Sequence, residues 1–445
     1  GYDELIDHLR TVDEATLLAA TGLPEIDVRT AFDLLAGAGS LITCWAMGVT
    51  QQIHATDTIR EITNLHLLTG NIGRDGAGLC PVRGHSNVQG DRTMGIWERP
   101  PATLIDRLEA RFGLPMPRHH GYDVAETLEA MYEGKIRAFI CMGGNFNRAI
   151  PDTARAEEAM AKVRLTVQVS TKLNRSHVTC GQTALILPAL GRTERDEQAS
   201  GPQFITVEDS MGMIHRSHGV LDPASPLLRS EMQIVAGMAR ATFGHDHAID
   251  WAAMADDYSV VRDMIADVIV GFDRFNERIA SPAGFELPHP PRDSRTFPTA
   301  TAKANFKANP FDPESIAANR PDDDVLVLQT MRSHDQYNTT IYGLSDRYRG
   351  IEGGRLVVFV SPNDIVRLGL SDGQLVDIVS QFAGDERVIR GFRVVSYPTP
   401  DGSCGAYYPE TNPLIPVAHR GKEAGTPASK FVPVKLVPHQ PATLS

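Results

Sequence analysis

The sequence predicts an α/β fold built on a doubly wound, mostly parallel sheet, followed by a separate barrel-like β domain. In the first half of the chain, apolar runs of strand length alternate with helical segments, an order typical of parallel sheets. Residues 291–324 are then rich in Pro, Ser, Thr and Asn, and short β-rich runs follow them. We therefore predict an α/β region over residues 1–290, a linker over residues 291–324 and a β domain over residues 325–445.

The α/β region contains repeated strand–helix units. Residues 1–40 are expected to be helical, with Phe32, Leu34 and Leu35 on one side. The apolar run at residues 40–50 predicts a buried strand, and the spacing of residues 57–70 predicts the helix after it. The alternation continues with strands at residues 135–145, 164–171 and 183–190 and a helix at residues 152–163. Because ligands of such sheets bind beyond the carboxyl ends of the strands, the loops at residues 47–54, 143–147 and 170–177 are expected to line a site.

The C-terminal region is dominated by short β-rich runs. They lie at residues 324–330, 355–361, 374–380 and 386–395. Between two of them, Ser361 is suited to a helix N-cap and Pro362 to the first helical position, and Asp364 gives a capping-box-like pattern. We expect a barrel-like domain that carries one short helix.

Composition limits the function classes. The 445 residues are 42% hydrophobic and 22% charged, as in globular proteins, and a net charge of −12 argues against a general nucleic-acid-binding surface. No apolar run approaches the roughly 18–20 residues that cross a bilayer. The five cysteines are scattered and form no Cys-x-x-Cys pair, so we predict no cysteine metal site and a reducing, cytoplasmic location. The chain starts without Met in a helix-rich stretch, so we expect it to be a C-terminal fragment.

The stretch "PVRGHSNVQG" at residues 81–90 fits neither a helical nor a strand period. Glycines before and within it allow close approach of the backbone to a ligand. Arg83 offers a permanently charged, forked donor, which suits an anionic oxygen substrate or a phosphate. A long surface loop with capping amides is the alternative. The spacing matches neither the dinucleotide fingerprint nor the P-loop.

The order of several motifs resembles the molybdopterin oxidoreductases, especially formate dehydrogenase α subunits. The resemblance rests on "AMGVTQQIH", "TGNIGRDGAG", "PVRGHSNVQGDRTMG", "MGGNFN", "QTMRSHDQYNTTIYG", "SPNDIVRLGLSDGQLVDIVS" and "GTPASKFVPVKL", in that order along nearly the whole chain. It implies α/β domains of the formate dehydrogenase and dimethyl sulfoxide reductase type and a C-terminal double-psi-like barrel. It also implies a bis(molybdopterin guanine dinucleotide) cofactor with molybdenum or tungsten. A [4Fe–4S] cluster would belong to a preceding part.

The resemblance further implies site residues. Arg83 would hold the anionic substrate, with His85 beside it as a proton acceptor or hydrogen-bond partner; formate dehydrogenases usually have Gln at the His85 position. No residue of the chain is expected to bind the metal. The family usually has Asp and Thr at the positions of Ser170 and Asn174. The implied cofactor-binding residues are Gly48, Thr50, Gln51, Gly144, Asn145, Ser170, Asn174, His215, Arg332, Gln336, Tyr337, Asn338, Thr339, Asn412 and Lys430.

The leading hypothesis is therefore that this chain is the C-terminal part of a molybdopterin-dependent two-electron oxidoreductase of formate dehydrogenase type. On its own the chain would be inactive. Its partners would be a small anionic substrate such as formate and an electron-transfer partner, with no nucleic acid and no membrane span. One alternative is a non-catalytic module that keeps the pterin-binding or nucleotide-binding loops, or uses them for protein contacts. A phosphotransferase is a weaker alternative, because no phosphate-transfer motif is present.

Overall fold

The computed structural model describes residues 1–312, 322–341 and 343–440, and its contacts divide the chain into two units. The barrel unit comprises Gly1–Pro81, Arg148–Ala154 and His289–Ser445, and the sheet unit comprises Val82–Asn147 and Arg155–Pro288. The predicted domain boundaries stay a prediction, because these units are interleaved along the sequence. Of the predicted linker, residues 313–321 lie outside the described residues.

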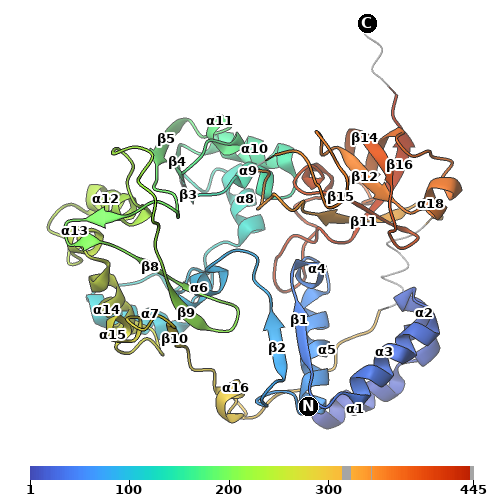
Figure 1. Ribbon diagram of the computed structural model, residues 1–445, viewed down its shortest axis with the longest axis horizontal. Coiled ribbons are helices and arrows are strands. Elements are labelled where there is room, and N and C mark those ends of the chain that lie inside the picture. Colours follow the sequence, from blue (N-terminus) through green and yellow to red (C-terminus); the bar gives the residue numbers. More distant parts are fainter. Residues whose placement is uncertain (313–321, 342, 441–445) are drawn as a thin grey trace, which may run out of the picture. The chain divides into compact units, whose positions relative to one another are not determined.

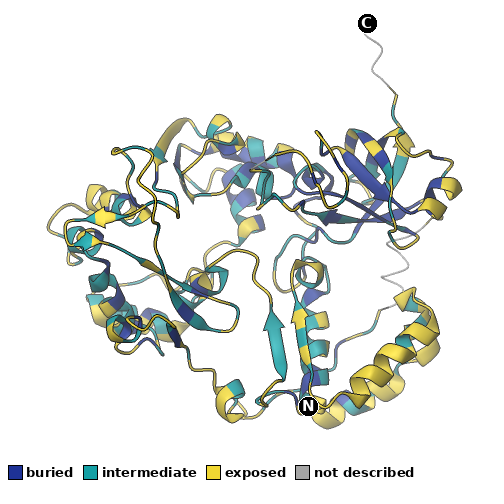
Figure 2. Cartoon of the chain, viewed as in Figure 1, coloured by how far each residue is buried: buried dark blue, intermediate teal, exposed yellow. Residues whose placement is uncertain are grey.

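A closed barrel forms the core of the barrel unit (Figure 1). Its strand order is β11-β15-β12-β14-β13-β16, and the pairs β11–β15 and β12–β14 are parallel, whereas the other four described pairs are antiparallel. The strands are β11 (Leu326–Met331), β12 (Val357–Val360), β13 (Leu375–Ser380), β14 (Val388–Ser396), β15 (Ser403–Tyr407) and β16 (Val432–Pro438). Their apolar side chains fill the interior, so the barrel is the most deeply buried part of this unit (Figure 2). The predicted barrel is confirmed.

The short helix predicted inside the barrel domain is α18 (Pro362–Arg367). The Ser361 side chain caps it by accepting a hydrogen bond from the Asp364 backbone N–H at 3.0 Å. The Asp364 carboxylate accepts instead from Gly402 N–H at 2.7 Å and pairs with Arg367 at 2.6 Å. The second half of the capping-box pattern therefore ties the helix to the start of β15. The one-turn helix η1 (Asn412–Leu414) lies between β15 and β16.

The N-terminal part of the barrel unit is mainly helical, as predicted. It contains α1 (Tyr2–Thr11), α2 (Glu14–Thr21), α3 (Glu25–Gly37), β1 (Ile42–Trp45), α4 (Met47–Thr50), α5 (Ala55–Leu68) and β2 (Gly78–Pro81). Strands β1 and β2 pair in parallel. After the linker begins, α16 (Pro290–Ser294) is a short helix. No helix among the described residues has the length and apolar character needed to cross a bilayer.

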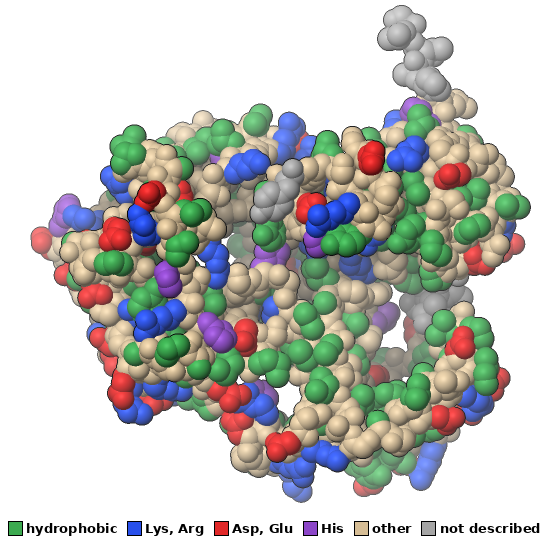
Figure 3. All heavy atoms as spheres, viewed as in Figure 1, with side chains coloured by type: hydrophobic (Ala, Val, Ile, Leu, Met, Phe, Trp, Pro, Cys, Tyr) green, Lys and Arg blue, Asp and Glu red, His purple; other side chains and the backbone are tan. Residues whose placement is uncertain are grey.

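In this part of the unit one apolar helical face is exposed, and the prediction of a buried strand is wrong. The apolar side of residues 25–37 is exposed, with Phe32 at 67% and Leu34 at 71%, and hydrophobic side chains gather on these helices (Figure 3). The strand predicted as buried at residues 40–50 ends at Trp45, and its first residue, Ile42, is 55% exposed. Helical spacing states which side chains share a face, but it does not state what covers that face.

The sheet unit contains the predicted parallel sheet, in the order β3-β4-β5. Its strands are β3 (Ala138–Met142), β4 (Leu165–Ser170) and β5 (Thr183–Pro188). The central strand is buried, and its Val167 and Val169 contact Ala189 and Ile234. The helices wholly within the sheet unit here are α6 (Val88–Thr93), α7 (Ala102–Phe112), α8 (Val124–Tyr132) and α11 (Arg175–Val178). Helices α9 (Phe146–Ala149) and α10 (Thr153–Lys162) each include residues of both units.

A small antiparallel sheet in the same unit was not predicted. It has the order β10-β9-β8, formed by β8 (Ile205–Glu208), β9 (Met213–Ser217) and β10 (Phe285–Glu286), and a two-residue hairpin of β6 (Glu197–Gln198) and β7 (Gly201–Pro202) precedes it. Phe272, Phe275, Ile279 and Phe285 form its buried core with Ile214. The remaining helices are α12 (Glu231–Phe243), α13 (Trp251–Asp256), α14 (Tyr258–Val268) and α15 (Phe275–Arg278).

Candidate functional site

Two half-buried cations, Arg332 and Lys430, lie at the ends of barrel strands. Arg332 follows β11, and Lys430 precedes β16 and donates through Nζ to the Thr330 carbonyl, with Thr330 Oγ1 at 3.3 Å. Burial and the charge of Arg332 lower the pKa of Lys430 to about 8. Within residues 1–312, 322–341 and 343–440, neither cation forms an ion pair with a carboxylate. Because two like charges out of water cost free energy, this pair favours an anionic ligand.

The guanidinium of Arg332 is fixed by neutral groups. Nη1 donates to Met47 Sδ at 2.9 Å, and Nη2 donates to Asn338 Oδ1 at 3.0 Å. The guanidinium also lies 4.7 Å from the centre of the Tyr408 ring, and burial lowers the pKa of Arg332. Among the described residues its buried Nε has no hydrogen-bond partner. A buried donor without a partner, next to an ammonium that pairs with no described carboxylate, is the arrangement expected where a ligand oxygen binds.

The loop around α4 lies beside this cation pair. The Gln51 carbonyl accepts from Lys430 N–H at 3.0 Å, and Gln51 Oε1 accepts from Ser429 Oγ at 2.9 Å. Gly48 accepts from Gln52 Nε2 at 2.9 Å through its carbonyl, and space is open where a Cβ would stand. Thr50 ends the same helix. The structure thus brings Gly48, Thr50 and Gln51 together with Arg332, Asn338 and Lys430.

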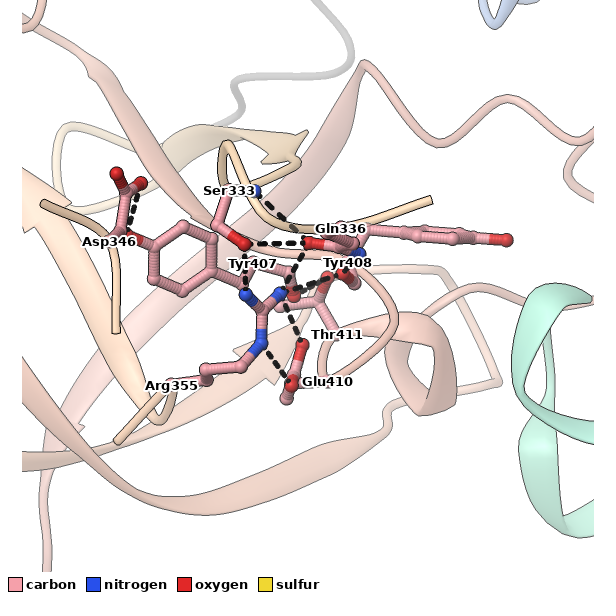
Figure 4. A network of polar contacts seen from close by, with 8 residues as sticks. All are labelled: Ser333, Gln336, Asp346, Arg355, Tyr407, Tyr408, Glu410 and Thr411. Atoms are coloured by element: carbon pink, nitrogen blue, oxygen red, sulfur yellow. Dashed lines mark hydrogen bonds and ion pairs between the residues drawn. The ribbon is translucent and has the colours of Figure 1, made fainter. Parts of the chain in front are cut away.

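Two other predicted residues are engaged in internal contacts of the barrel unit. Gln336 Oε1 accepts from Ser333 N–H at 3.0 Å and from Arg355 Nη2 at 2.7 Å, and Gln336 Nε2 donates to the Tyr408 carbonyl. Arg355 in turn pairs with Glu410 at 2.6 Å and lies over the Tyr407 ring (Figure 4). These contacts support a structural role for Gln336; its role in cofactor binding stays a prediction.

Asn412 also bonds within its own unit. Its Nδ2 donates to the carbonyls of Arg148 at 2.6 Å and Ile150 at 3.0 Å, and its side chain is buried. Tyr337 and Thr339 stand in the tight turn after Arg332, where Tyr337 N–H donates to the Thr339 carbonyl at 3.2 Å and the Tyr337 side chain is half exposed. The turn carries Asn338 to Arg332.

The sheet unit contains the loop of Arg83, which is more regular than predicted. Pro81 ends β2 and α6 begins at Val88, so the stretch at residues 81–90, which fits neither a helical nor a strand period, starts at a strand end and runs into a helix. Asn87 starts α6 in the left-handed conformation, with φ 68°. A Cβ on Gly90 would stand 2.0 Å from Asn87 Oδ1, so a larger residue there would displace the Asn87 side chain. The left-handed conformation of Asn87 turns the backbone into the helix.

Arg83 is exposed but oriented. Its backbone N–H donates to Ser210 Oγ at 3.0 Å, and Nε donates to Gln89 Oε1 at 2.9 Å. In the described part of the chain, Nη1 and Nη2 have no hydrogen-bond partner. Ser86 of the same loop accepts from Arg192 Nη1 at 2.9 Å. The guanidinium of Arg83 is therefore oriented through Nε, and its two terminal nitrogens are available for an oxyanion.

Glu208 contacts this loop through Asn87 and was not identified from the sequence. Its backbone N–H donates to Asn87 Oδ1 at 3.0 Å. Its side chain is buried, and Oε2 has no hydrogen-bond partner within the described ranges. Burial raises the pKa of Glu208, whereas the nearby Thr93, Gln89 and Arg83 act in the opposite direction. Nothing local in the sequence marks Glu208, because its importance comes from contacts with residues about 120 positions earlier in the chain.

The two predicted histidines lie on different elements. His85 lies on the exposed part of the Arg83 loop, two residues after Arg83. His215 in β9 forms a contact of 2.9 Å between Nε2 and Asp209 Oδ2. Burial alone would raise the pKa of Asp209, but hydrogen bonds from His215 and from the Met213 and Met211 backbone outweigh it and lower that pKa.

The ends of β3 and β4 gather four further predicted residues. Gly143 and Gly144 both adopt positive φ, and Asn174 Nδ2 donates to the Gly144 carbonyl at 2.7 Å. Asn145 Oδ1 accepts from Ser176 Oγ at 3.2 Å. Ser170 ends β4, and its buried hydroxyl has no hydrogen-bond partner in the part of the chain that the structure describes. The structure therefore brings Gly144, Asn145 and Asn174 together at the carboxyl edge of the sheet, as predicted for a doubly wound fold.

A cavity of about 850 Å³ opens at this edge of the sheet unit. Ser170 and Gly143 line it, together with apolar side chains such as Trp251 and Met254. Its charged lining is mainly acidic, namely Asp91, Glu194, Asp196 and Glu231, with Arg192 and His218. A cavity of this size, mostly apolar with a few polar groups, suits a ring-containing ligand.

Comparison with known proteins identifies two family matches. Residues 19–202 match the molybdopterin oxidoreductase model, and residues 326–433 match the molybdopterin dinucleotide-binding domain model. The chain is 51% identical, over 98% of its length, to an uncharacterized oxidoreductase of Mycobacterium tuberculosis, and it spans 56% of that relative. It is 27% identical, over 84% of its length, to a candidate formate dehydrogenase of Bacillus subtilis, and it spans 38% of that protein.

A solved structure shares the fold. Acetylene hydratase from Pelobacter acetylenicus superposes with a TM-score of 0.60 at 12% identity, over 94% of this chain and 63% of that one. At this identity the likeness concerns the fold and not the reaction.

Proposed function

The chain belongs to the molybdopterin oxidoreductase family, and from that premise we propose that it takes part in two-electron oxidation or reduction of a small oxyanion, with formate as the leading substrate. The observation that carries the proposal is the cation pair of Arg332 and Lys430. These two half-buried positive charges have no carboxylate partner among the described residues, and they lie in the stretch that matches the dinucleotide-binding domain, so they favour a bound anion.

The residues present fit a pterin dinucleotide. Arg332 and Lys430 would hold phosphate or pterin oxygens, and Gln51, Thr50 and Asn338 would supply hydrogen bonds to the ring edge, with Gly48 leaving room for close approach. When bound, molybdenum or tungsten on such a cofactor accepts or donates the two electrons of the reaction. The orphaned Nε of Arg332 is the strongest sign that a ligand group completes this site.

The sheet unit would hold a nucleoside end of the same kind of cofactor. Gly144, Asn145 and Asn174 form the polar edge. The buried Ser170 hydroxyl, which has no hydrogen-bond partner among the described residues, would form a hydrogen bond to the ligand. The adjoining cavity has the size and the mixed lining for a purine base. The full cofactor proposed is bis(molybdopterin guanine dinucleotide).

Arg83 would bind the anionic substrate. Its guanidinium is oriented through Nε and keeps two parallel donors for a carboxylate. His85 would accept or donate a proton nearby, and its imidazole in place of the more usual Gln bears on which substrate is preferred. Substitution of His85→Gln should therefore raise formate turnover relative to other small acids.

The remaining parts of the proposal concern the whole protein. We propose a [4Fe–4S] cluster and an electron-transfer partner that accept the electrons, and a cytoplasmic location. The alternative is a binding module of the same fold without turnover. The distinction lies in electron transfer to a dye, because both hypotheses require the pterin-binding residues.

The test uses the full-length protein expressed with molybdate or tungstate. We expect about one metal and a fluorescent pterin oxidation product per cofactor site, and formate-dependent reduction of a redox dye. The double substitution Arg332→Ala and Lys430→Ala should remove most of the bound metal and pterin. The matched control Arg393→Ala changes an exposed barrel arginine and should leave both unchanged.

Wild-type protein without pterin would overturn the cofactor assignment. Full cofactor content in the double variant would show that the cation pair does not hold it. Bound cofactor without dye reduction for any small acid would favour the binding module.

A further inference from the structure

Cys44 and Cys80 face each other across two parallel strands. They are register partners in the β1–β2 pair, between the partners Thr43–Leu79 and Trp45–Pro81. Neighbouring strands lie about 4.8 Å apart, and a disulfide requires Cα atoms about 4.4–6.8 Å apart. Side chains of register partners also project to the same side of a sheet. The backbone therefore already meets the main distance requirement of a disulfide.

The two thiols are reduced and differ in environment. Cys44 is exposed, whereas Cys80 is half-buried. Burial raises the pKa of Cys80, and its interaction with the Cys44 thiol raises that pKa further, so the two sulfur atoms are near enough to interact. Cys44 is therefore the thiol that a reagent in solvent reaches first, and Cys80 is the one positioned to resolve the product.

The other three cysteines lack this arrangement. Cys141 in β3 is the register partner of Gln168, and Cys404 in β15 is buried beside Leu328 and Val360. Cys180 lies outside the described strands. The chain thus supplies three internal controls for any reaction of the pair.

We propose that Cys44 and Cys80 are a thiol modification site that forms a reversible intramolecular disulfide on exposure to a peroxide. The Cys44 thiolate attacks the peroxide, its O–O bond breaks, and a sulfenic acid and one water result. The Cys80 thiolate then attacks the Cys44 sulfur, the S–S bond forms and a second water leaves. Two electrons pass from the two thiols to the peroxide, and both thiol protons end in water. A dithiol reductant reverses the reaction.

The position of the pair gives the modification a consequence. Strand β1 leads directly into α4 with Gly48 and Thr50, and β2 leads in two residues to Arg83. A covalent link at this level would fix the ends of both strands just before the two loops begin. That consequence for activity rests on the proposed function, whereas formation of the disulfide does not.

The experiment treats the reduced full-length protein with a small excess of hydrogen peroxide, followed by alkylation and peptide mass spectrometry. We expect a linked peptide pair containing Cys44 and Cys80, two hydrogens lighter than the reduced pair, in most molecules. Dithiothreitol should restore both thiols. Cys404 should stay unmodified throughout, because it is buried.

Cys44→Ser and Cys80→Ser should each abolish the linked peptide, whereas the matched variant Cys141→Ser should retain it. The result that overturns the proposal is read on the unaltered protein: both cysteines alkylated, or Cys44 carried to sulfinic acid, with no linked peptide. A disulfide between Cys44 and any other cysteine would overturn it equally. Loss of formate activity without the linked peptide would leave the proposed function intact and exclude the disulfide as its cause.

Discussion

The cation pair of the barrel and the loop of Arg83 both present positive charge, but in opposite settings. Arg332 and Lys430 are half-buried, and burial lowers the pKa of each. Arg83 is exposed, and its orientation comes from hydrogen bonds to Ser210 and Gln89. The buried pair of Arg332 and Lys430 destabilises the protein without a ligand, and a bound anion offsets this cost. The solvated Arg83 destabilises the ligand-free protein little.

This difference fits two kinds of ligand. A site that is destabilised when empty favours a ligand that stays bound, as a cofactor does. A site that is oriented but solvated can release its ligand in every turnover, as a substrate site must. Within the proposed function we therefore assign cofactor retention to the barrel and substrate contact to Arg83.

A third arginine provides the reference for both. Arg355 is 4% exposed and is paired with Glu410, with further hydrogen bonds to Ser333 and Gln336 (Figure 4). Its charge is thus neutralised and its donors are used within the protein. Burial of an arginine alone does not indicate a ligand site; burial without a carboxylate partner does.

The largest expected effect separates Arg355 from Arg332. Removing one partner of a buried ion pair leaves the other charge uncompensated, so Arg355→Met should lower the free energy of unfolding by about 3–5 kcal/mol. Arg332→Met should change the free energy of unfolding of the cofactor-free protein by less than about 1 kcal/mol, or raise it, because it relieves repulsion with Lys430. Urea unfolding of both variants measures this. Equal losses would mean that Arg332 has a structural role like that of Arg355.

The next effect concerns the exposed arginine. Arg83→Lys keeps the charge but loses the planar fork, so kcat/KM for formate should fall by about 30- to 1,000-fold, equal to about 2–4 kcal/mol. Cofactor content should stay unchanged, since we propose that the barrel cations hold the cofactor. Arg111→Lys, an exposed change on α7, is the control. Loss of the metal with normal turnover per remaining cofactor would assign Arg83 to cofactor retention instead.

The titration of Lys430 tests the barrel site without turnover. Its pKa of about 8 lies below the usual value of about 10.4 for lysine, so the lysine loses its charge as the pH rises through about 8. Pyrophosphate affinity of cofactor-free protein should fall by about tenfold or more as the pH rises above 8, because a charge-assisted hydrogen bond is lost. Lys430→Arg stays charged and should remove this dependence.

The pH dependence of stability has the opposite sign to that of anion binding. Between pH 8 and about pH 10.4 the unfolded state binds a proton at Lys430 that the folded state lacks, so the stability of the cofactor-free protein should rise across this window. Below pH 8 the cost of the buried charge is fully present. A flat profile in the native protein together with pH-independent anion binding would exclude Lys430 from the site.

Local sequence patterns predicted the parts of the fold that local patterns determine. The parallel strands β3, β4 and β5, four barrel strands and the cap of α18 all follow from apolar runs and N-cap residue types. Strand β15 escaped notice because "SCGAY" lacks the β-branched residues that mark a strand. The exposure of Phe32 could not be read from spacing, since spacing does not identify a covering surface.

The site could be predicted only in part for the same reason. Family resemblance indicated Arg332, Lys430 and Gln51. Their proximity depends on the fold, which brings Gln51 against Ser429, 378 residues later in the chain. The lowered pKa of Lys430 arises from burial and from Arg332, and no local pattern contains either. Glu208 was missed entirely, because only the folded chain places it under the Arg83 loop.

The smallest expected effect concerns Glu208, and it tests whether Arg83 is oriented from behind. Gln89 accepts from Arg83 Nε, and the Glu208 carboxyl lies close enough to Gln89 for that amide to lower its pKa. Glu208→Gln keeps the shape of the side chain but removes its negative charge. That charge favours the orientation of the Gln89 amide in which its NH₂ group points to residue 208 and its oxygen accepts from Arg83. With this support weakened, Arg83 should lose about 1 kcal/mol of orientation, and KM for formate should rise about fivefold with kcat nearly unchanged.

Stability distinguishes this role from a purely structural one. Because burial raises the pKa of Glu208, its ionisation costs the folded protein stability as the pH rises above the unfolded pKa of about 4.3. Glu208→Gln should therefore be as stable as the native protein at pH 7, or more stable, even while KM rises. The control Asp209→Asn alters the neighbouring carboxylate, which pairs with His215, and should leave KM unchanged. If Glu208→Gln leaves KM unchanged while Arg83→Lys lowers kcat/KM, then Ser210 and Gln89 orient Arg83 without the buried carboxyl.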